Sequence, residues 1–166
     1  REHSLAVLEG GGLTAWGAAE WCGSSDGQAV LGEEPDFGEF QLRPIATDGC
    51  SLAPHRVTGM ADIVSVATGP MHSLGLTLDG RVYAWGSGAA GKLGLRLRQH
   101  DVRIPRQIDF RTKRVMKVAC GFVHSAAVSE AGEVLTWCAG GWGNLGLGPM
   151  GDDPEVNSPK IVERLL

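Results

Sequence analysis

The sequence lacks the features that would assign it to several common classes of protein. No apolar run approaches the ~18–20 residues that cross a bilayer, and no signal-peptide pattern opens the chain. The four cysteines contain no C-x-x-C pair of the kind that holds structural zinc. These absences predict no membrane span, no metal site and an intracellular protein, cytoplasmic or nuclear, whose cysteines are reduced.

Helical periodicity is also missing, whereas glycine is plentiful. Glycine accounts for 25 of 166 residues, without a collagen period or a low-complexity tract. Many glycines at regular places indicate many tight turns, which are typical of an all-β fold. The chain starts at Arg1, so we expect either an excised piece or a missing upstream part.

An internal repeat organises the chain. Three His-Ser pairs are each followed by glycine 8 residues after the histidine and by tryptophan 13 residues after it. The second and third copies are 52 residues apart throughout, whereas the first and second are 69 apart, which indicates an insertion in the first unit. The repeated residues, to which we assign structural roles, are His3, His72 and His124, Trp16, Trp85 and Trp137, and Gly80 and Gly132 with Gly11.

Each unit contains short strand patterns in a fixed order. Leu74, Leu76 and Leu78 alternate along one such run, and Asp79-Gly80 after it predicts a hairpin with a type I′ turn. The strands predicted in the second unit are Ile63–Gly69, Ser73–Leu78, Arg81–Trp85 and Ile104–Ile108. Those predicted in the third unit are Val115–Gly121, Ser125–Ser129, Glu133–Trp137 and Ser158–Val162.

Four strands per unit with no helix between them predict an antiparallel propeller blade. We expect an incomplete β-propeller of about three four-stranded blades, in units of about 1–60, 61–112 and 113–166. The first unit lacks its leading strand, so about eleven strands are expected, and it carries an insertion at about 18–53. Blades bury their faces only against other blades, so further blades of a parent chain or self-association should cover both ends.

The repeat resembles that of the RCC1 (regulator of chromosome condensation) family. The resemblance rests on Val118–Ser125, Asp79–Gly86 and Gly91–Leu95, and it covers nearly the whole chain. It implies a seven-bladed propeller, of which this chain holds about three units. The chain departs from the pattern at Cys138, which stands where Gly86 stands in the second unit, and at Ala131, which replaces Asp79.

Two motifs that suggest chemistry have simpler explanations. Gly86–Gly91 matches G-x-G-x-x-G, but no helix follows to hold a pyrophosphate, so a repeated turn is favoured and no cofactor is expected. Adjacent strand residues point to opposite faces, so a histidine cannot activate the serine beside it. We interpret the histidines as structural, bonded to backbone near each inner strand, and the repeated tryptophans as packing between blades.

Charge is distributed unevenly although the net charge is only −4. Residues 18–53 contain seven acids and one base, whereas Lys92–Lys117 contains nine bases and two acids. Both segments fit solvated loops, and the basic one also fits contact with an acidic surface or a phosphate backbone. The candidate partner contacts are Trp21, Glu33, Glu34, Asp36, Arg96, Arg98, Arg103 and Trp142.

The function predicted first is a non-catalytic interaction scaffold that binds a protein partner. The resemblance implies a second hypothesis, a guanine-nucleotide exchange factor for a Ran-like small GTPase, with residues 18–53 as the wedge. A third hypothesis is chromatin or phosphate binding through Arg96–Lys117, although this segment lacks the interleaved aromatics of a single-strand nucleic-acid platform. No catalytic residue is predicted.

Overall fold

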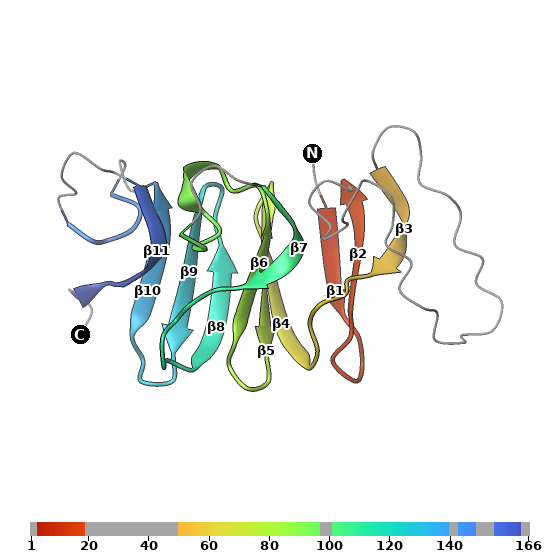
Figure 1. Ribbon diagram of the computed structural model, residues 1–166, viewed down its shortest axis with the longest axis horizontal. Helices are drawn as coiled ribbons and strands as arrows, with labels where there is room; N and C mark the ends of the chain where they lie inside the picture. The colour runs from red at the N-terminus through yellow and green to blue at the C-terminus, as the bar shows by residue number, and fades with distance from the viewer. Residues whose placement is uncertain (1–2, 19–49, 97–100, 140–142, 149–154, 164–166) are drawn as a thin grey trace.

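The computed structural model describes residues 3–18, 50–96, 101–139, 143–148 and 155–163. Within them, eleven strands form three antiparallel sheets that stand side by side in an open row (Figure 1). The expectation of an incomplete propeller with about eleven strands is confirmed. Each sheet lies within one predicted unit, and the exact unit boundaries stay predictions.

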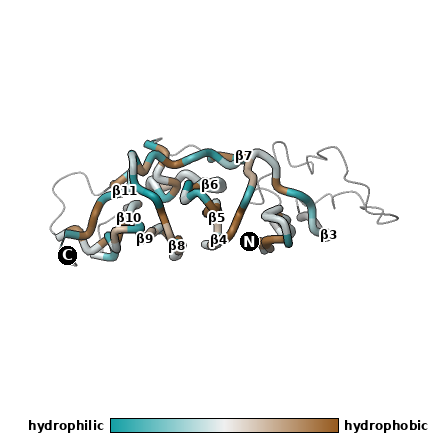
Figure 2. The backbone as a smooth tube through the Cα atoms, turned by 90° about the horizontal axis from the view of Figure 1, so that it is seen from below, coloured by the Kyte–Doolittle hydropathy of each residue, from teal (hydrophilic) through white to brown (hydrophobic). Residues whose placement is uncertain are grey.

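Blade 1 has three strands and the other two blades have four. The order within each sheet follows the sequence. Blade 1 contains β1 (His3–Val7), β2 (Leu13–Ala18) and β3 (Cys50–Arg56); blade 2 contains β4 (Ile63–Thr68), β5 (His72–Thr77), β6 (Val82–Gly86) and β7 (Val102–Gln107). Blade 3 contains β8 (Val115–Cys120), β9 (His124–Ser129), β10 (Val134–Ala139) and β11 (Glu155–Ile161). Blades 2 and 3 step from β4 and β8 on one side of the row to β7 and β11 on the other (Figure 2).

The hairpin after β5 differs from the predicted type I′ turn. Gly80 has φ of 83°, but Asp79 is not in the left-handed region that a type I′ turn requires. Gly80 N donates to Thr77 O at 2.9 Å, and Thr77 N donates to Arg81 O at 2.9 Å. These bonds define a three-residue loop in which only Gly80 has a positive φ. A left-handed backbone at Asp79 would be sterically unfavourable, so the three-residue loop is favoured over the two-residue turn.

A bulge recurs where each blade's penultimate described strand meets its last strand. The register shifts between Ala15 and Gly17 in blade 1, and at the equivalent places in blades 2 and 3. The residue after each tryptophan has a positive φ: 104° at Gly17, 107° at Gly86 and 134° at Cys138. The departure from the repeat pattern at Cys138 therefore places a side chain where the backbone favours glycine.

The core lies within and between the blades. Trp85 and Trp137 are fully buried, and Leu74, Val82 and Val115 are buried beside them. All six residues of β5 are buried, because β5 is the second strand of the middle blade and has neighbours on both faces. This packing fixes the position of each hairpin tip and each inter-strand loop, where the candidate sites lie.

Candidate functional site

The His-Ser pairs act between blades and not within them. His3 Nε2 lies 2.6 Å from Ser73 Oγ in the next blade, and His72 Nε2 lies 3.0 Å from Ser125 Oγ in the blade after it. Each histidine thus reaches the serine that follows the next histidine in the sequence. Each ring has a serine hydroxyl as a partner, because the β-pleat turns the serine toward the preceding blade, and the backbone of His124 also forms a hydrogen bond with His72.

The direction of proton donation gives these pairs a structural role. Ser125 Oγ donates to the backbone oxygen of Lys92 at 2.8 Å, so it accepts the hydrogen of His72 Nε2. A histidine that serves as general base would instead accept the serine proton. His72 Nδ1 is buried and has no partner among the described residues, so no third group orients this ring as in a triad.

Burial keeps the rings of His3 and His72 neutral. Desolvation by burial, followed by the nearby positive charge of Lys92, lowers the pKa of His72 to about 3. Burial also lowers the pKa of His3. Neutral rings at both junctions leave the Nε2–H of His72 as a donor to Ser125 at physiological pH.

Glycines make room for the histidine rings. A Cβ at Gly69 would stand 2.6 Å from His72 Cε1 and 2.6 Å from Gly121 O of the next blade. Real Cβ atoms do not come that close to other atoms, so the ring lies directly against the glycine backbone. Gly69 N also donates to His72 O at 2.8 Å, and Gly121 N donates to His124 O at the same distance. The Gly-x-x-His spacing is therefore a tight turn that seats the ring.

A tryptophan closes the junction between blades 2 and 3. Trp137 Nε1 donates to Lys92 O at 2.9 Å, the same oxygen that accepts from Ser125. A Cβ at Gly94 would stand 2.7 Å from Trp137 Nε1, so the indole lies against that glycine. The loop that resembled a dinucleotide fingerprint, with the 3-10 turn η2 (Ala89–Gly91), serves to hold this tryptophan.

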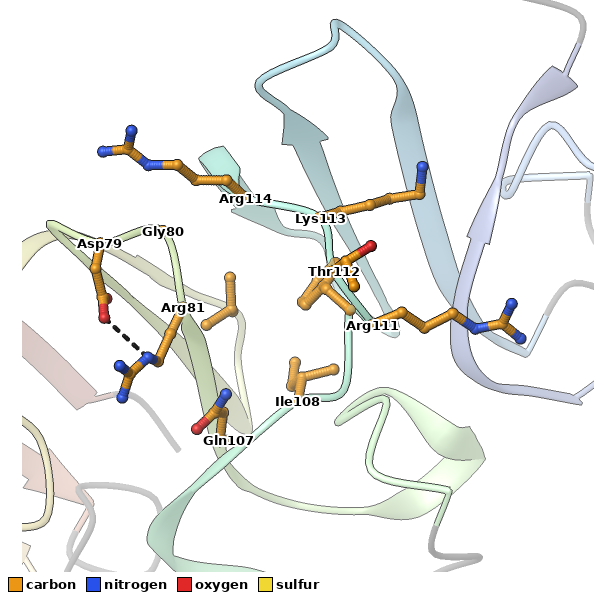
Figure 3. Close-up of a pocket in the computed structure, with 11 residues that line it drawn as sticks. Asp79, Gly80, Arg81, Gln107, Ile108, Arg111, Thr112, Lys113 and Arg114 are labelled. Atoms are coloured by element: carbon orange, nitrogen blue, oxygen red, sulfur yellow. Dashed lines mark ion pairs between the residues drawn. The ribbon is translucent and has the colours of Figure 1, made fainter.

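A groove lies between the hairpin tip of blade 2 and the segment that leads into blade 3. Its volume is about 250 Å³. Val82, Ile108 and Phe110 are buried residues along it, and Phe110 packs edge-on against Trp137 with ring centroids 5.6 Å apart. Four cations line it from two segments far apart in the sequence: Arg81, Arg111, Lys113 and Arg114 (Figure 3). We call it the hairpin-tip groove.

Ion pairs neutralise much of this basic region. Arg81 Nε pairs with Asp79 at 2.8 Å, and Lys113 Nζ pairs with Glu133 at 2.6 Å. The Lys113 bond, followed by the bond from Ser129, holds the pKa of Glu133 below its ordinary value. Arg114 reaches Leu78 O at 3.0 Å and also pairs with Glu130.

Arg111 is the exception among the cations of the groove. It is exposed, its φ is 60°, and its side chain has no ion pair with any described residue. In Figure 3 its guanidinium extends away from the Asp79–Arg81 pair. A non-glycine residue in the left-handed region costs about 1–2 kcal/mol, so the arginine is kept at a conformational disadvantage. It is the cation of the groove best placed to meet an external anion.

Backbone hydrogen bonds hold the walls of the hairpin-tip groove together. Val115 N donates to Gly80 O at 3.0 Å between blades 3 and 2, and Ile108 N donates to Val82 O at 2.8 Å within blade 2. The sequence analysis identified the basic segment as a candidate site, but it did not identify Asp79 and Arg81, which line the groove from the hairpin. Their charges on either side of Gly80, at the tip of a hairpin, were the signal in the sequence that could have indicated them.

Of the predicted partner contacts, two are exposed in the structure and the others lie outside the described residues. Arg96 is exposed and pairs with Asp109 at 3.2 Å, and Arg103 is exposed on β7. Lys92, counted among the bases, is buried, and burial lowers its pKa. Outside the described residues lie Trp21, Glu33, Glu34, Asp36, Arg98 and Trp142.

The described residues contain neither a candidate metal cluster nor a membrane-spanning helix. No cluster of three His, Cys, Asp or Glu side chains there is suited to hold a metal ion. None of the helices in that part of the chain has the length and apolar character that crossing a bilayer requires.

The known proteins that this chain is similar to contain the same kind of repeat. Two sequence profiles, both described as the regulator of chromosome condensation (RCC1) repeat, match residues 79–128 and 63–92. The human E3 ubiquitin-protein ligase HERC2 is 40% identical over 72% of this chain, and the probable human ligase HERC3 is 34% identical over 97% of it. The chain spans only 2% and 14% of their respective lengths.

A solved structure shares the fold. The crystal structure of Prp20p from Saccharomyces cerevisiae matches 98% of this chain with a TM-score of 0.74 and 24% identity. This chain covers 36% of that protein, which has binding properties to Gsp1p and histones. At this identity the match concerns the arrangement of blades.

Proposed function

Because this chain belongs to the RCC1 repeat family, we propose that it is a non-catalytic interaction scaffold whose hairpin-tip groove receives an acidic segment of a protein partner. The observation that carries the proposal is the combination of buried apolar residues with an exposed Arg111 that has no ion pair with any described residue, both at one groove. Related RCC1-repeat proteins as different as ubiquitin ligases and a plant ultraviolet-B receptor support a shared scaffold role.

The size and charge of the groove define the chemistry of the segment. A volume of about 250 Å³ suits one or two side chains and not a whole domain. Phe110 and Ile108 favour an apolar or aromatic anchor, and Arg111 favours a carboxylate next to it. An acidic peptide with one aromatic residue therefore fits better than a nucleic-acid backbone, which would meet cations already paired with Asp79, Glu130 and Glu133.

A peptide titration tests the proposal. The probe is a fluorescent peptide with one phenylalanine flanked by glutamates, and the same peptide with lysines in place of the glutamates is the comparison. Arg111→Asn should weaken binding, because asparagine tolerates the left-handed backbone and only the cation is lost. Arg106→Asn is the matched control, since Arg106 is exposed on β7 and does not line the groove. Equal affinity of both variants for the glutamate peptide would contradict the proposal.

The exchange-factor hypothesis stays a prediction, because its wedge at about 18–53 lies almost wholly outside the described residues. Nucleotide release from a Ran-like GTPase, with and without the chain, measures it directly. Chromatin contact through Arg96–Lys117 is likewise a prediction, and steep salt dependence of DNA binding would support it. An intracellular location, cytoplasmic or nuclear, likewise stays a proposal.

A further inference from the structure

Most of the large exposed apolar side chains lie along one edge of the row of blades. The loops between β1 and β2, β5 and β6, and β9 and β10 are at this edge, the lower one in Figure 1, together with the beginnings of β4 and β8. Six large apolar side chains among the described residues are about half exposed or more. Four of them belong to these loops and strand ends, and we call the surface that they form the apolar edge: Leu8, Val64, Leu78 and Met116. Apolar side chains gathered in this way mark an interaction site.

A bulge that recurs in two blades turns Val64 and Met116 outward. Ile63 and Ser65 pair with adjacent residues of β5, so Val64 is the extra residue between them. Met116 is the extra residue at the equivalent place in β8, and such bulges re-aim a side chain. The two side chains are 50% and 49% exposed, although blade 2 has a blade on either side (Figure 1) and blade 3 has one. Their exposure therefore belongs to the apolar edge and does not depend on where the row ends.

Leu78, at the hairpin tip of the middle blade, is tied to the beginnings of both of these strands. Its side chain is among the most exposed of the apolar residues, at 66%. Leu78 N donates to Asp62 O at 2.9 Å, and Asp62 stands two residues before Val64. Leu78 O accepts from Arg114 at 3.0 Å, and Arg114 stands two residues before Met116. These bonds bring the three exposed apolar side chains to neighbouring places on the apolar edge.

Backbone groups at the apolar edge bond to one another across the blades. Ile63 N donates to Gly11 O at 3.0 Å between blades 2 and 1, and Val115 N donates to Gly80 O at 3.0 Å between blades 3 and 2. A partner that binds by adding a strand needs free backbone groups on a sheet edge, so these bonds disfavour that mode. A partner at the apolar edge is recognised through side chains and must satisfy its own backbone, as a helix does.

The charges at the apolar edge have opposite signs at its two ends. Two ion pairs described above neutralise the tip of blade 2 in the middle. Three exposed charges form no ion pair with a described residue: Glu9 and Asp62 lie where blades 1 and 2 meet, and Lys117 lies on β8 of blade 3. A phosphate backbone would meet the two acids, whereas a helix has a partial positive charge at its N-terminus and a partial negative charge at its C-terminus. The charge pattern therefore complements a helix that lies along the row.

We propose that the apolar edge docks an amphipathic helix of a protein partner, with the N-terminal end of the helix over blade 1 and its C-terminal end over blade 3. Apolar residues at i, i+3, i+4 and i+7 of the helix cover Val64, Leu78 and Met116. The acids at one end of the edge and Lys117 at the other set the orientation. The lining of the hairpin-tip groove contains none of the four apolar residues of this edge, so the inference is independent of the groove.

A designed peptide serves as the probe. It is a fluorescent helical peptide of about five turns, with leucines at i, i+3, i+4 and i+7 and neutral polar residues elsewhere. A peptide of the same composition, with its leucines placed so that they form no common face, is the comparison. The 166-residue chain should bind the first peptide and not the second, as measured by fluorescence anisotropy. A photoreactive group at the N-terminal end of the peptide should cross-link to blade 1, and one at the C-terminal end to blade 3.

Two variants of the apolar edge have controls of matched exposure elsewhere on the surface. Leu78→Asn, at a side chain 66% exposed, is matched by Phe122→Asn, at one 69% exposed in the loop between β8 and β9. Val64→Thr is matched by Ile104→Thr on β7, both at side chains 50% exposed. All four positions are exposed, so each variant should fold, which urea unfolding checks.

The variants of the apolar edge should bind the peptide more weakly than their controls. Leu78→Asn should raise the Kd about tenfold, because the bound peptide no longer buries a leucine there, and Val64→Thr should raise it less. Phe122→Asn and Ile104→Thr should bind as wild type does. Absence of binding by wild type, equal affinity for the two peptides, an equal loss in the controls, or cross-links at the opposite ends would each overturn the proposal.

Discussion

Acidification should destabilise this protein before any carboxylate titrates, because His72 is buried as a neutral ring. Its pKa is about 3 in the folded chain and about 6.5 when unfolded. Below pH 6.5 the unfolded chain takes up a proton that the folded chain does not, so the free energy of unfolding falls with pH. Stability from this residue is fully present above pH 6.5 and is lost progressively down to about pH 3.

The size of the effect follows from the shift. Each pH unit within this window costs about 1.4 kcal/mol, so lowering the pH from 6.5 to 5 should remove about 2 kcal/mol through His72 alone. His3, whose pKa is also lowered by burial, adds to the same slope. Asp79 and Glu133 have lowered pKa values, so their contributions are retained at pH 5 and lost only at lower pH.

Urea unfolding at pH 8, 6.5 and 5 measures the slope. His72→Gln keeps an N–H donor for Ser125 but does not titrate, so it should be less stable at pH 8 and lose less on acidification. The comparison of slopes removes the constant cost of the substitution. If wild type and His72→Gln lose the same free energy between pH 8 and pH 5, His72 is not buried as a neutral ring and the reasoning fails.

Two further predictions concern the contacts between blades. Trp137→Phe removes the N–H that donates to Lys92 O, and it should lower the free energy of unfolding in urea by about 1 kcal/mol. Trp85→Phe should lower it less, since Trp85 Nε1 has no acceptor among the described residues. Equal losses would contradict a stabilising role for the Trp137–Lys92 bond. Gly69→Ala should destabilise by roughly 1–3 kcal/mol, because its Cβ would meet the His72 ring and Gly121 O. Gly12→Ala should be milder, since Gly12 also lacks a positive φ and its Cβ would meet nothing nearer than Leu8 Cδ1 at 3.7 Å. A lowered Tm only in Gly12→Ala would refute this account.

The blade architecture was predictable because the repeat marks every strand. The 52-residue register places His, Gly and Trp at fixed points, and hairpin signals at Gly80 and Gly132 divide the strands. The turn type was wrong because Asp-Gly also fits a three-residue loop, and only the backbone bonds of Thr77 distinguish the two.

The contacts that define the sites were harder to infer. Strand alternation shows that His72 cannot reach Ser73, but it does not reveal that Ser125 of the next blade is within reach. Likewise, the basic segment was visible as a run of charges, whereas its pairing with Glu130 and Glu133 depends on how blade 3 folds back over it. Such partners are set by three-dimensional packing between repeats and leave no local pattern.

The order of strands within the blades bears on how the chain folds. Each sheet is a meander in which every strand pairs with its neighbour in the sequence, so most pairings close short loops. A blade can therefore fold from contacts that are close in the sequence. The histidine and tryptophan contacts then stabilise it against the next blade, as in a linear repeat protein whose repeats contact only their neighbours. The weakest contact between neighbouring blades limits how many blades of such an array unfold together. Among the described residues, more side-chain hydrogen bonds join blades 2 and 3 than join blades 1 and 2, so the junction between blades 1 and 2 is where this array would first divide on unfolding.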